Sequence, residues 1–176
     1  RPLLPEPPVE EYTSEFQSPL FSQENGRRPD VPQQGTGICI GIADWGFDFT
    51  HPNFVNDDGS TRFIAIWDQR APYDGQNPYG YGAVHDRDSI NAALNAEFPF
   101  DWLGYHHDKN DVFNLGTHGI HVCDIAAGNG SVGEPGIAPK ANLIAVHLAT
   151  DKFKDLMGLG DSARVFDALH FLDATA

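Results

Sequence analysis

Two short and largely apolar runs constrain the fold of this chain more than any other feature. They are residues 38–43 (ICIGIA) and residues 141–148 (ANLIAVHL). Near-continuous apolar character is typical of parallel strands that are covered on both faces. Residues 118–126, which lie between the two runs, have the apolar spacing of a helix. The order strand, helix, strand therefore predicts an α/β layered fold with a mainly parallel sheet.

Further segments extend this pattern. Residues 62–67 (RFIAIW) predict another strand, and Asp86 or Asp88 is expected to cap a short helix that follows. A final amphipathic helix is expected to begin at Asp161 or Ser162. The apolar positions of that final helix are Val165, Phe166, Leu169 and Leu172.

Three stretches are expected to be irregular. Residues 1–34 are rich in proline, which prevents a regular helix or a central strand, so we expect an arm that lies over a surface or is disordered. Residues 68–82 and 98–115 lack helical or strand periodicity, and we expect loops there. Arg1 is not the product of translation initiation, so the amino terminus is expected to result from cleavage or truncation.

The charge of the chain excludes several classes of partner. Eleven Lys and Arg residues stand against 25 Asp and Glu residues, which gives a formal net charge of -14. Such a charge repels phosphate backbones and anionic membranes, so nucleic acid is not expected as a partner. The apolar runs are far shorter than the roughly 20 residues of a membrane-spanning helix, so no membrane span is expected.

Two groups of residues leave alternatives open. Cys39 and Cys123 lie in apolar surroundings and are expected to be buried free thiols, with a disulfide or a reactive thiol as the alternative. The second group is a polar cluster that fits a solvated surface better than a metal site. Its members are His106, His107, Asp108 and Asp111.

Asp44 and His118 are the strongest candidates for chemistry. Asp44 follows the first apolar run, and the carboxyl ends of such strands form the edge at which open α/β sheets place their active sites. His118 begins the expected helix. A carboxylate bonded to one imidazole nitrogen fixes the tautomer, so the other nitrogen can deprotonate a nucleophile. We expect the Asp44 carboxylate about 2.6 to 3.2 Å from Nδ1 of His118.

Three motifs in this order resemble those of the subtilisin-like serine peptidases, which are the subtilases of peptidase family S8. Residues 35–54, with the sequence DWGFD at 44–48, resemble the block that carries the catalytic aspartate of the family. Residues 118–122 (HGIHV) resemble its histidine block, and residues 136–146 resemble the strand that follows. The sequence IWDQ in the interval between the blocks resembles a bacterial subgroup related to the clostridial germination proteases.

The resemblance implies a three-layer subtilisin-like fold and a role for several residues. Asp44 would orient the base, His118 would be the base, and His121 would be a second, structural histidine near the site. A segment before the final helix would pair with the backbone of the substrate as a β-strand. That segment consists of Gly158, Leu159 and Gly160.

The domain organisation follows from the same resemblance. Residues 1–34 would be an arm, and residues 35–176 would be the N-terminal part of a peptidase domain with an insertion at about 55–115. The nucleophilic serine and the oxyanion-hole asparagine of the family have no matching motif here. We therefore expect a serine endopeptidase that is not competent as this chain alone. Its partner would be the C-terminal part of the same domain, which carries the serine, and its substrate a peptide or protein.

Other functions remain as alternatives. The chain would be a pseudopeptidase or a peptide-binding module if its continuation lacked the serine. His118, His121 and Asp124 also have the spacing of metal ligands on one helix, but a separation of three residues suits two histidine ligands less well than four.

The resemblance also bears on cofactors and location. Asn53 stands where many subtilases have an aspartate that helps to hold calcium, and the turn after Gly128 is short, so a structural calcium site is not expected. No other cofactor is expected. The resemblance favours a secreted or extracellular protein.

Overall fold

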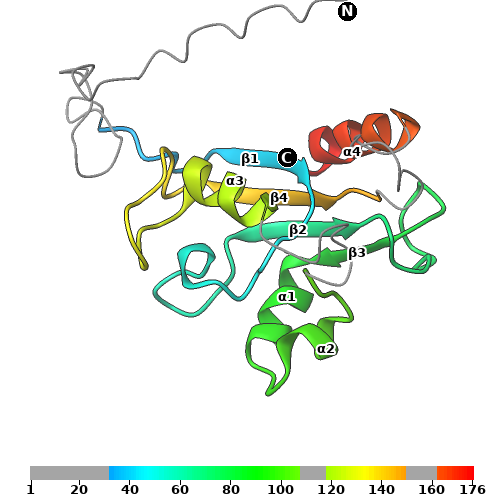
Figure 1. Cartoon of the computed structure of the whole chain (residues 1–176), viewed down its shortest axis with the longest axis horizontal. Coiled ribbons are helices and arrows are strands. Elements are labelled where there is room, and N and C mark those ends of the chain that lie inside the picture. Colours follow the sequence, from blue (N-terminus) through cyan, green and yellow to red (C-terminus); the bar gives the residue numbers. More distant parts are fainter. Residues whose placement is uncertain (1–31, 108–117, 150–161) are drawn as a thin grey trace, which may run out of the picture.

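The strands in the described part of the chain form one sheet of four strands. The computed structural model describes residues 32–107, 118–149 and 162–176. The sheet has the order β1-β4-β2-β3 (Figure 1). β1, β4 and β2 are parallel, and β3 runs antiparallel to β2, so the prediction of a mainly parallel sheet is confirmed. The strands are β1 (Cys39–Asp44), β2 (Phe63–Asp68), β3 (Ala83–Asp86) and β4 (Asn142–His147).

Helices cover both faces of this sheet and give the fold three layers. α3 packs against β1 and α1 packs against β2 and β3 on one face, whereas α4 packs against β1 and β4 on the other. No helix within the described ranges is long and apolar enough to cross a membrane. The helices are η1 (Pro52–Phe54, a 3-10 turn), α1 (Arg87–Leu94), α2 (Pro99–Leu103), α3 (His118–Ala127) and α4 (Ser162–Thr175).

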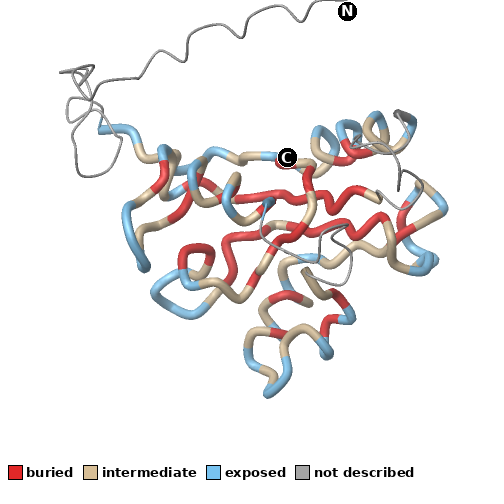
Figure 2. Tube along the Cα trace, in the orientation of Figure 1, coloured by how far each residue is buried: buried red, intermediate tan, exposed pale blue. Residues whose placement is uncertain are grey.

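The side chains of the central strands divide the core into two apolar clusters. Leu143 and Ala145 of β4 join the cluster beneath α3 and α1, whereas Ile144 and Val146 join the cluster beneath α4. Figure 2 shows buried residues along both β4 and β2. Because both faces of β4 are covered, its consecutive residues are apolar, and this is why the apolar run predicted the strand.

The register of the three parallel strands places their last residues in one row. Asp44 of β1 pairs with His147 of β4, and His147 pairs with Asp68 of β2. The three residues are 8%, 0% and 3% exposed, in that order. The carboxyl edge of the three parallel strands is therefore lined by buried polar side chains.

Two short elements differ from the sequence-based expectation. β3 has four residues, of which His85 and Asp86 are polar, so the strand leaves no apolar run. α2 lies in the stretch that was expected to be a loop, and it has only five residues. It begins at Pro99 and ends at Gly104, whose φ of 72° lies in the left-handed region. A helix of this length shows no periodicity.

The buried face of α4 also differs from the expected one. Phe166 and Leu169 are 72% and 54% exposed, whereas Ala168 and Phe171 are buried. The helix approaches β1 closely, since a Cβ on Gly41 would lie 3.0 Å from Leu172 Cδ2. The small side chain of Ala168 and the missing side chain of Gly41 therefore allow a different stripe of α4 to face the sheet.

Candidate active site

Asp44 is fixed at the carboxyl end of β1 by backbone contacts. Its carbonyl oxygen accepts a hydrogen bond of 2.8 Å from the amide of Leu148, which follows β4. The amide of Trp45 donates to the Asp44 carboxylate at 2.7 Å. The side chain of Asp44 is only 11% exposed. Its carboxylate is therefore held in place before any contact with His118.

His118 is the first residue of α3 and faces this carboxylate. Nδ1 of His118 lies 2.7 Å from Asp44 Oδ1 and 2.8 Å from Asp44 Oδ2. Both distances lie in the expected range. An ionised carboxylate only accepts hydrogen bonds, so Nδ1 carries the proton, and in the neutral imidazole Nε2 holds the lone pair. The side chain of His118 is 57% exposed, so a reactant can approach the ring from solvent.

The backbone that follows Asp44 brings the two side chains together. The amide of Gly119 donates to the carbonyl oxygen of Trp45 at 2.7 Å, and the amide of Ile120 donates to that of Gly46 at 3.0 Å. These are amides of the first turn of α3, which have no acceptor within the helix itself. A Cβ on Gly119 would lie 2.6 Å from the carbonyl oxygen of Trp45, so this close approach requires glycine.

Comparison with known proteins identifies the family. The model of the subtilase family, peptidase family S8, matches residues 35–162, which is most of the chain. This chain belongs to the subtilase family. The matched region contains both Asp44 and His118. The predicted resemblance is thereby confirmed, and so is the subtilisin-like α/β fold.

This subtilase chain spans only a small part of the length of two relatives that it matches. The serine protease/ABC transporter B family protein tagD of Dictyostelium discoideum is 30% identical over 131 residues, which are 72% of this chain and 5% of that protein. The structure of the Clostridium perfringens CspB protease matches with a TM-score of 0.66 and 28% identity. That match covers 83% of this chain and 27% of the CspB chain.

Trp45 also contacts the side chain of His118 in this subtilase. Its indole stacks on the imidazole with ring centroids 4.8 Å apart and an angle of 19° between the planes. Sequence reasoning did not find this contact, because an aromatic residue after an aspartate does not reveal which ring it faces.

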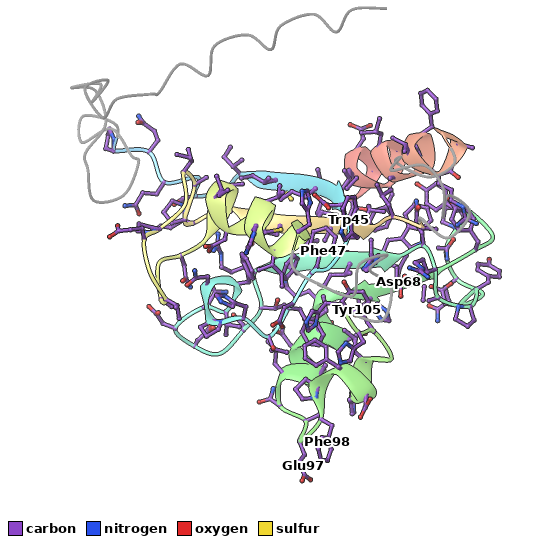
Figure 3. The ribbon with its side chains drawn as sticks, in the orientation of Figure 1. Trp45, Phe47, Asp68, Glu97, Phe98 and Tyr105 are labelled. Atoms are coloured by element: carbon purple, nitrogen blue, oxygen red, sulfur yellow. The ribbon has the colours of Figure 1, made fainter. Side chains whose placement is uncertain are left out.

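A second layer of contacts supports the backbone after Asp44. The hydroxyl oxygen of Tyr105 accepts a hydrogen bond of 3.1 Å from the amide of Phe47 and lies 3.0 Å from Nδ1 of His147. Tyr105 and His147 are both 0% exposed, and burial raises the pKa of Tyr105 well above its ordinary value. The phenol therefore stays neutral. Figure 3 shows Trp45 and Phe47 near the carboxyl end of β1, with Tyr105 on the side of α1.

The structure describes the positions of some of the other predicted site residues. His121 lies on α3 and is exposed. Gly158, Leu159 and Gly160 lie outside the described residues, as do Asp108 and Asp111 of the polar cluster. His106 and His107 are stacked on each other and lie against Phe100.

The alternative metal site on α3 is not assembled here. Asp124 accepts a hydrogen bond of 2.7 Å from the side-chain amide of Asn53, whereas His118 faces Asp44. Asn53 is 1% exposed, and its amide also bonds the backbone of Val132. In the part of the chain that the structure describes, no three His, Cys, Asp or Glu residues are grouped to hold a metal ion.

Both cysteines are free thiols. Cys123 is 1% exposed, and burial together with the nearby Asp44 and Asp124 carboxylates raises its pKa. Cys39 is partly exposed, and burial raises its pKa as well, against the smaller effect of Arg87. A high pKa keeps each thiol protonated near neutral pH, and a protonated thiol is a poor nucleophile.

Proposed function

We propose that this chain supplies two members of the Ser-His-Asp triad of a serine endopeptidase that hydrolyses peptide bonds. The observation that carries the proposal is the bond from Nδ1 of His118 to both carboxylate oxygens of Asp44. Membership of the subtilase family supports the same reaction class. A triad needs a base that is oriented by a carboxylate and open to a nucleophile, and the burial of Asp44 with the exposure of His118 meets both needs.

Each residue then has a definite role. Nε2 of His118 removes the hydroxyl proton of the serine as its oxygen attacks the peptide carbonyl carbon. The resulting imidazolium gives this proton to the leaving amine, and an acyl-enzyme forms. Water then attacks the acyl-enzyme with His118 again as the base. Asp44 keeps the proton on Nδ1 and stabilises the imidazolium throughout. The reaction needs no metal ion and no organic cofactor.

The serine and the oxyanion-hole asparagine come, in this proposal, from a separate or following polypeptide segment. Two of the described serines have other roles, since Ser60 donates its hydroxyl proton to Asp58 in a turn and Ser89 donates to Asp86 at the start of α1. β1 is an edge strand of the described sheet, so one side of it can pair with a further strand. In this proposal the partner is the C-terminal part of the same peptidase domain.

The domain boundaries and the substrate contacts belong to this proposal. Residues 35–176 are the N-terminal part of the peptidase domain, with residues of about 55–115 as an insertion. Gly158, Leu159 and Gly160 pair with the backbone of the peptide substrate. Without a serine in the partner segment, the same surface would bind peptides without cleaving them.

Labelling with a fluorophosphonate tests the proposal, because this reagent reacts with a serine that a histidine activates. The protein used is this chain together with the polypeptide segment proposed to carry the serine. We expect one labelled serine, located by mass spectrometry of peptides from that segment. The variant His118→Ala should lose the label, and the matched control His170→Ala, at an exposed position of α4, should keep it. Labelling that survives His118→Ala would overturn the proposal, and a complete lack of labelling would favour the peptide-binding alternative.

A further inference from the structure

Trp45 is the residue whose side chain covers the ring of His118. We propose that Trp45 is a positioning residue of the triad, whose indole fixes the plane of the imidazole and stabilises the imidazolium. This inference rests on the proposed peptidase function. It goes beyond that function because it assigns a role to a residue outside the three members of the triad.

The backbone of Trp45 already holds both partners of the triad pair. Its amide donates to Asp44 Oδ1 at 2.7 Å, and its carbonyl oxygen accepts from the amide of Gly119 at 2.7 Å. The indole adds a third contact, with the imidazole face at a centroid distance of 4.8 Å. One residue therefore contacts the carboxylate, the first turn of α3 and the ring of the base.

The stacking supplies a restraint that the hydrogen bond to Asp44 does not. The bond at Nδ1 determines where that nitrogen lies, but the ring can still tilt about it, and the tilt determines the direction of Nε2. Since the side chain of His118 is 57% exposed, few other side chains can limit this tilt. A flat indole at an angle of 19° restricts the ring plane, so that Nε2 points to one place.

The same contact has a charge-dependent part. The face of an indole is negative, and it attracts a cation that lies within about 6 Å of its centre. The imidazole becomes a cation only after it has removed the proton from the serine. Attraction that strengthens at this step lowers the barrier and raises kcat, whereas attraction to the neutral ring would not.

Apolar packing does not account for the position of Trp45. Neither of the two apolar clusters in the described ranges includes it, and its side chain is only partly buried. Trp67 provides the contrast, because it is 0% exposed and lies within the cluster beneath α4. In the part of the chain that the structure describes, the indole of Trp45 stacks on the ring of His118.

Kinetics of two variants of this chain, assayed together with the segment proposed to carry the serine, test this role. Trp45→Leu keeps an apolar side chain without an aromatic face, and we expect kcat to fall about 3- to 10-fold while KM stays within about twofold. Trp45→Phe keeps an aromatic face and should recover most of kcat. The control Trp102→Leu, at an exposed position of α2, should leave both constants unchanged. Equal kcat values for Trp45→Leu and Trp45→Phe would overturn the proposal, since a packing role predicts them.

Nuclear magnetic resonance on this chain tests the stacking without any peptidase activity. The ring current of an indole moves the carbon-bound protons of a stacked imidazole upfield. We expect upfield His118 ring signals in the wild type and in Trp45→Phe, and signals close to those of free histidine in Trp45→Leu. Upfield signals that persist in Trp45→Leu would overturn the inference even if the enzyme is active. Expected shifts with no activity would support the positioning of the ring and would reject the peptidase function instead.

Discussion

The amide of Gly119 lies 2.7 Å from the carbonyl oxygen of Trp45, so the first turn of α3 rests on the backbone that follows Asp44. This contact connects the strand that carries the carboxylate to the helix that carries the base. It satisfies a helix amide that would otherwise lack an acceptor. The geometry of the Asp44–His118 pair therefore depends on Gly119, which takes no part in the chemistry.

Replacing Gly119 by alanine should separate the pair. A Cβ at this position would lie 2.6 Å from the Trp45 carbonyl oxygen and 2.9 Å from Phe47 Cε1, so α3 must move. We expect the free energy of unfolding to fall by about 1–3 kcal/mol in urea titrations. Glycine to alanine in an ordinary helix raises stability by about 1 kcal/mol, so the expected sign is the opposite of the usual one. Ile125→Ala, at a position of α3 that is 72% exposed, is the control and should change stability little. A stabilised Gly119→Ala variant would contradict the close docking.

Replacing Tyr105 by phenylalanine should weaken the support of the same backbone. The variant removes the acceptor of the Phe47 amide and the bond to His147 at a site without solvent. Loss of a buried hydrogen-bond partner costs about 1–3 kcal/mol. Tyr73→Phe is the control, because Tyr73 is 50% exposed and its hydroxyl donates to the backbone carbonyl of Asn77. Urea unfolding of both variants measures the difference, and equal losses would show that Tyr105 has no special role.

Arg62 should be important for the other end of α3. Its guanidinium is buried and donates to the carbonyl oxygens of Asn53, Ala127 and Ala141. Arg62→Met would leave these carbonyls without this donor, and we expect a loss of about 3 kcal/mol or more. Lys140→Met, at an exposed position, should change stability by less than about 0.5 kcal/mol. A similar small effect for Arg62→Met would mean that water replaces the guanidinium.

The stability of the chain should depend on pH through His85. Burial lowers the pKa of His85, and the opposing attraction of Asp74 and Asp86 is smaller. The unfolded chain therefore binds a proton at a higher pH than the folded chain does. Protonation of His85 does not lower the free energy of unfolding above about pH 6.5, the ordinary pKa of histidine. As the pH falls below this value, the free energy of unfolding decreases. Urea unfolding from pH 7.5 to pH 5 should show a smaller decrease for His85→Gln than for the wild type. Identical slopes would remove His85 as a cause.

The sequence predicted the strands that are covered on both faces and the polar residues at the ends of those strands. The apolar runs predicted β1 and β4 because both strands lie between the two apolar clusters, and helices pack on both faces of β1. Asp44 and His118 could be paired in advance because a strand end and a helix start meet at the carboxyl edge of a parallel sheet. In the structure, Nδ1 of His118 lies 2.7 Å from Asp44 Oδ1.

The remaining features depend on tertiary contacts that no local pattern encodes. β3 is short and half polar, and it forms a strand because it pairs with β2. Tyr105 reaches the Phe47 amide across 58 positions of sequence. Which face of α4 is buried depends on how closely the helix can approach Gly41, and not on the helix sequence alone. The stacking of Trp45 on His118 could not be predicted from the sequence, because it depends on where α3 begins.

The most direct test of the central claim is the rate of peptide hydrolysis by the Asp44→Asn variant of this chain, assayed together with the segment proposed to carry the serine. An asparagine side chain cannot hold the proton on Nδ1 of His118, so the imidazole adopts the wrong tautomer with little change in shape. We predict that kcat falls by about 10⁴-fold, with thermal unfolding close to that of the wild type and with the control His170→Ala fully active. A kcat within tenfold of the wild-type value would contradict the assignment of Asp44 and His118 to a catalytic triad.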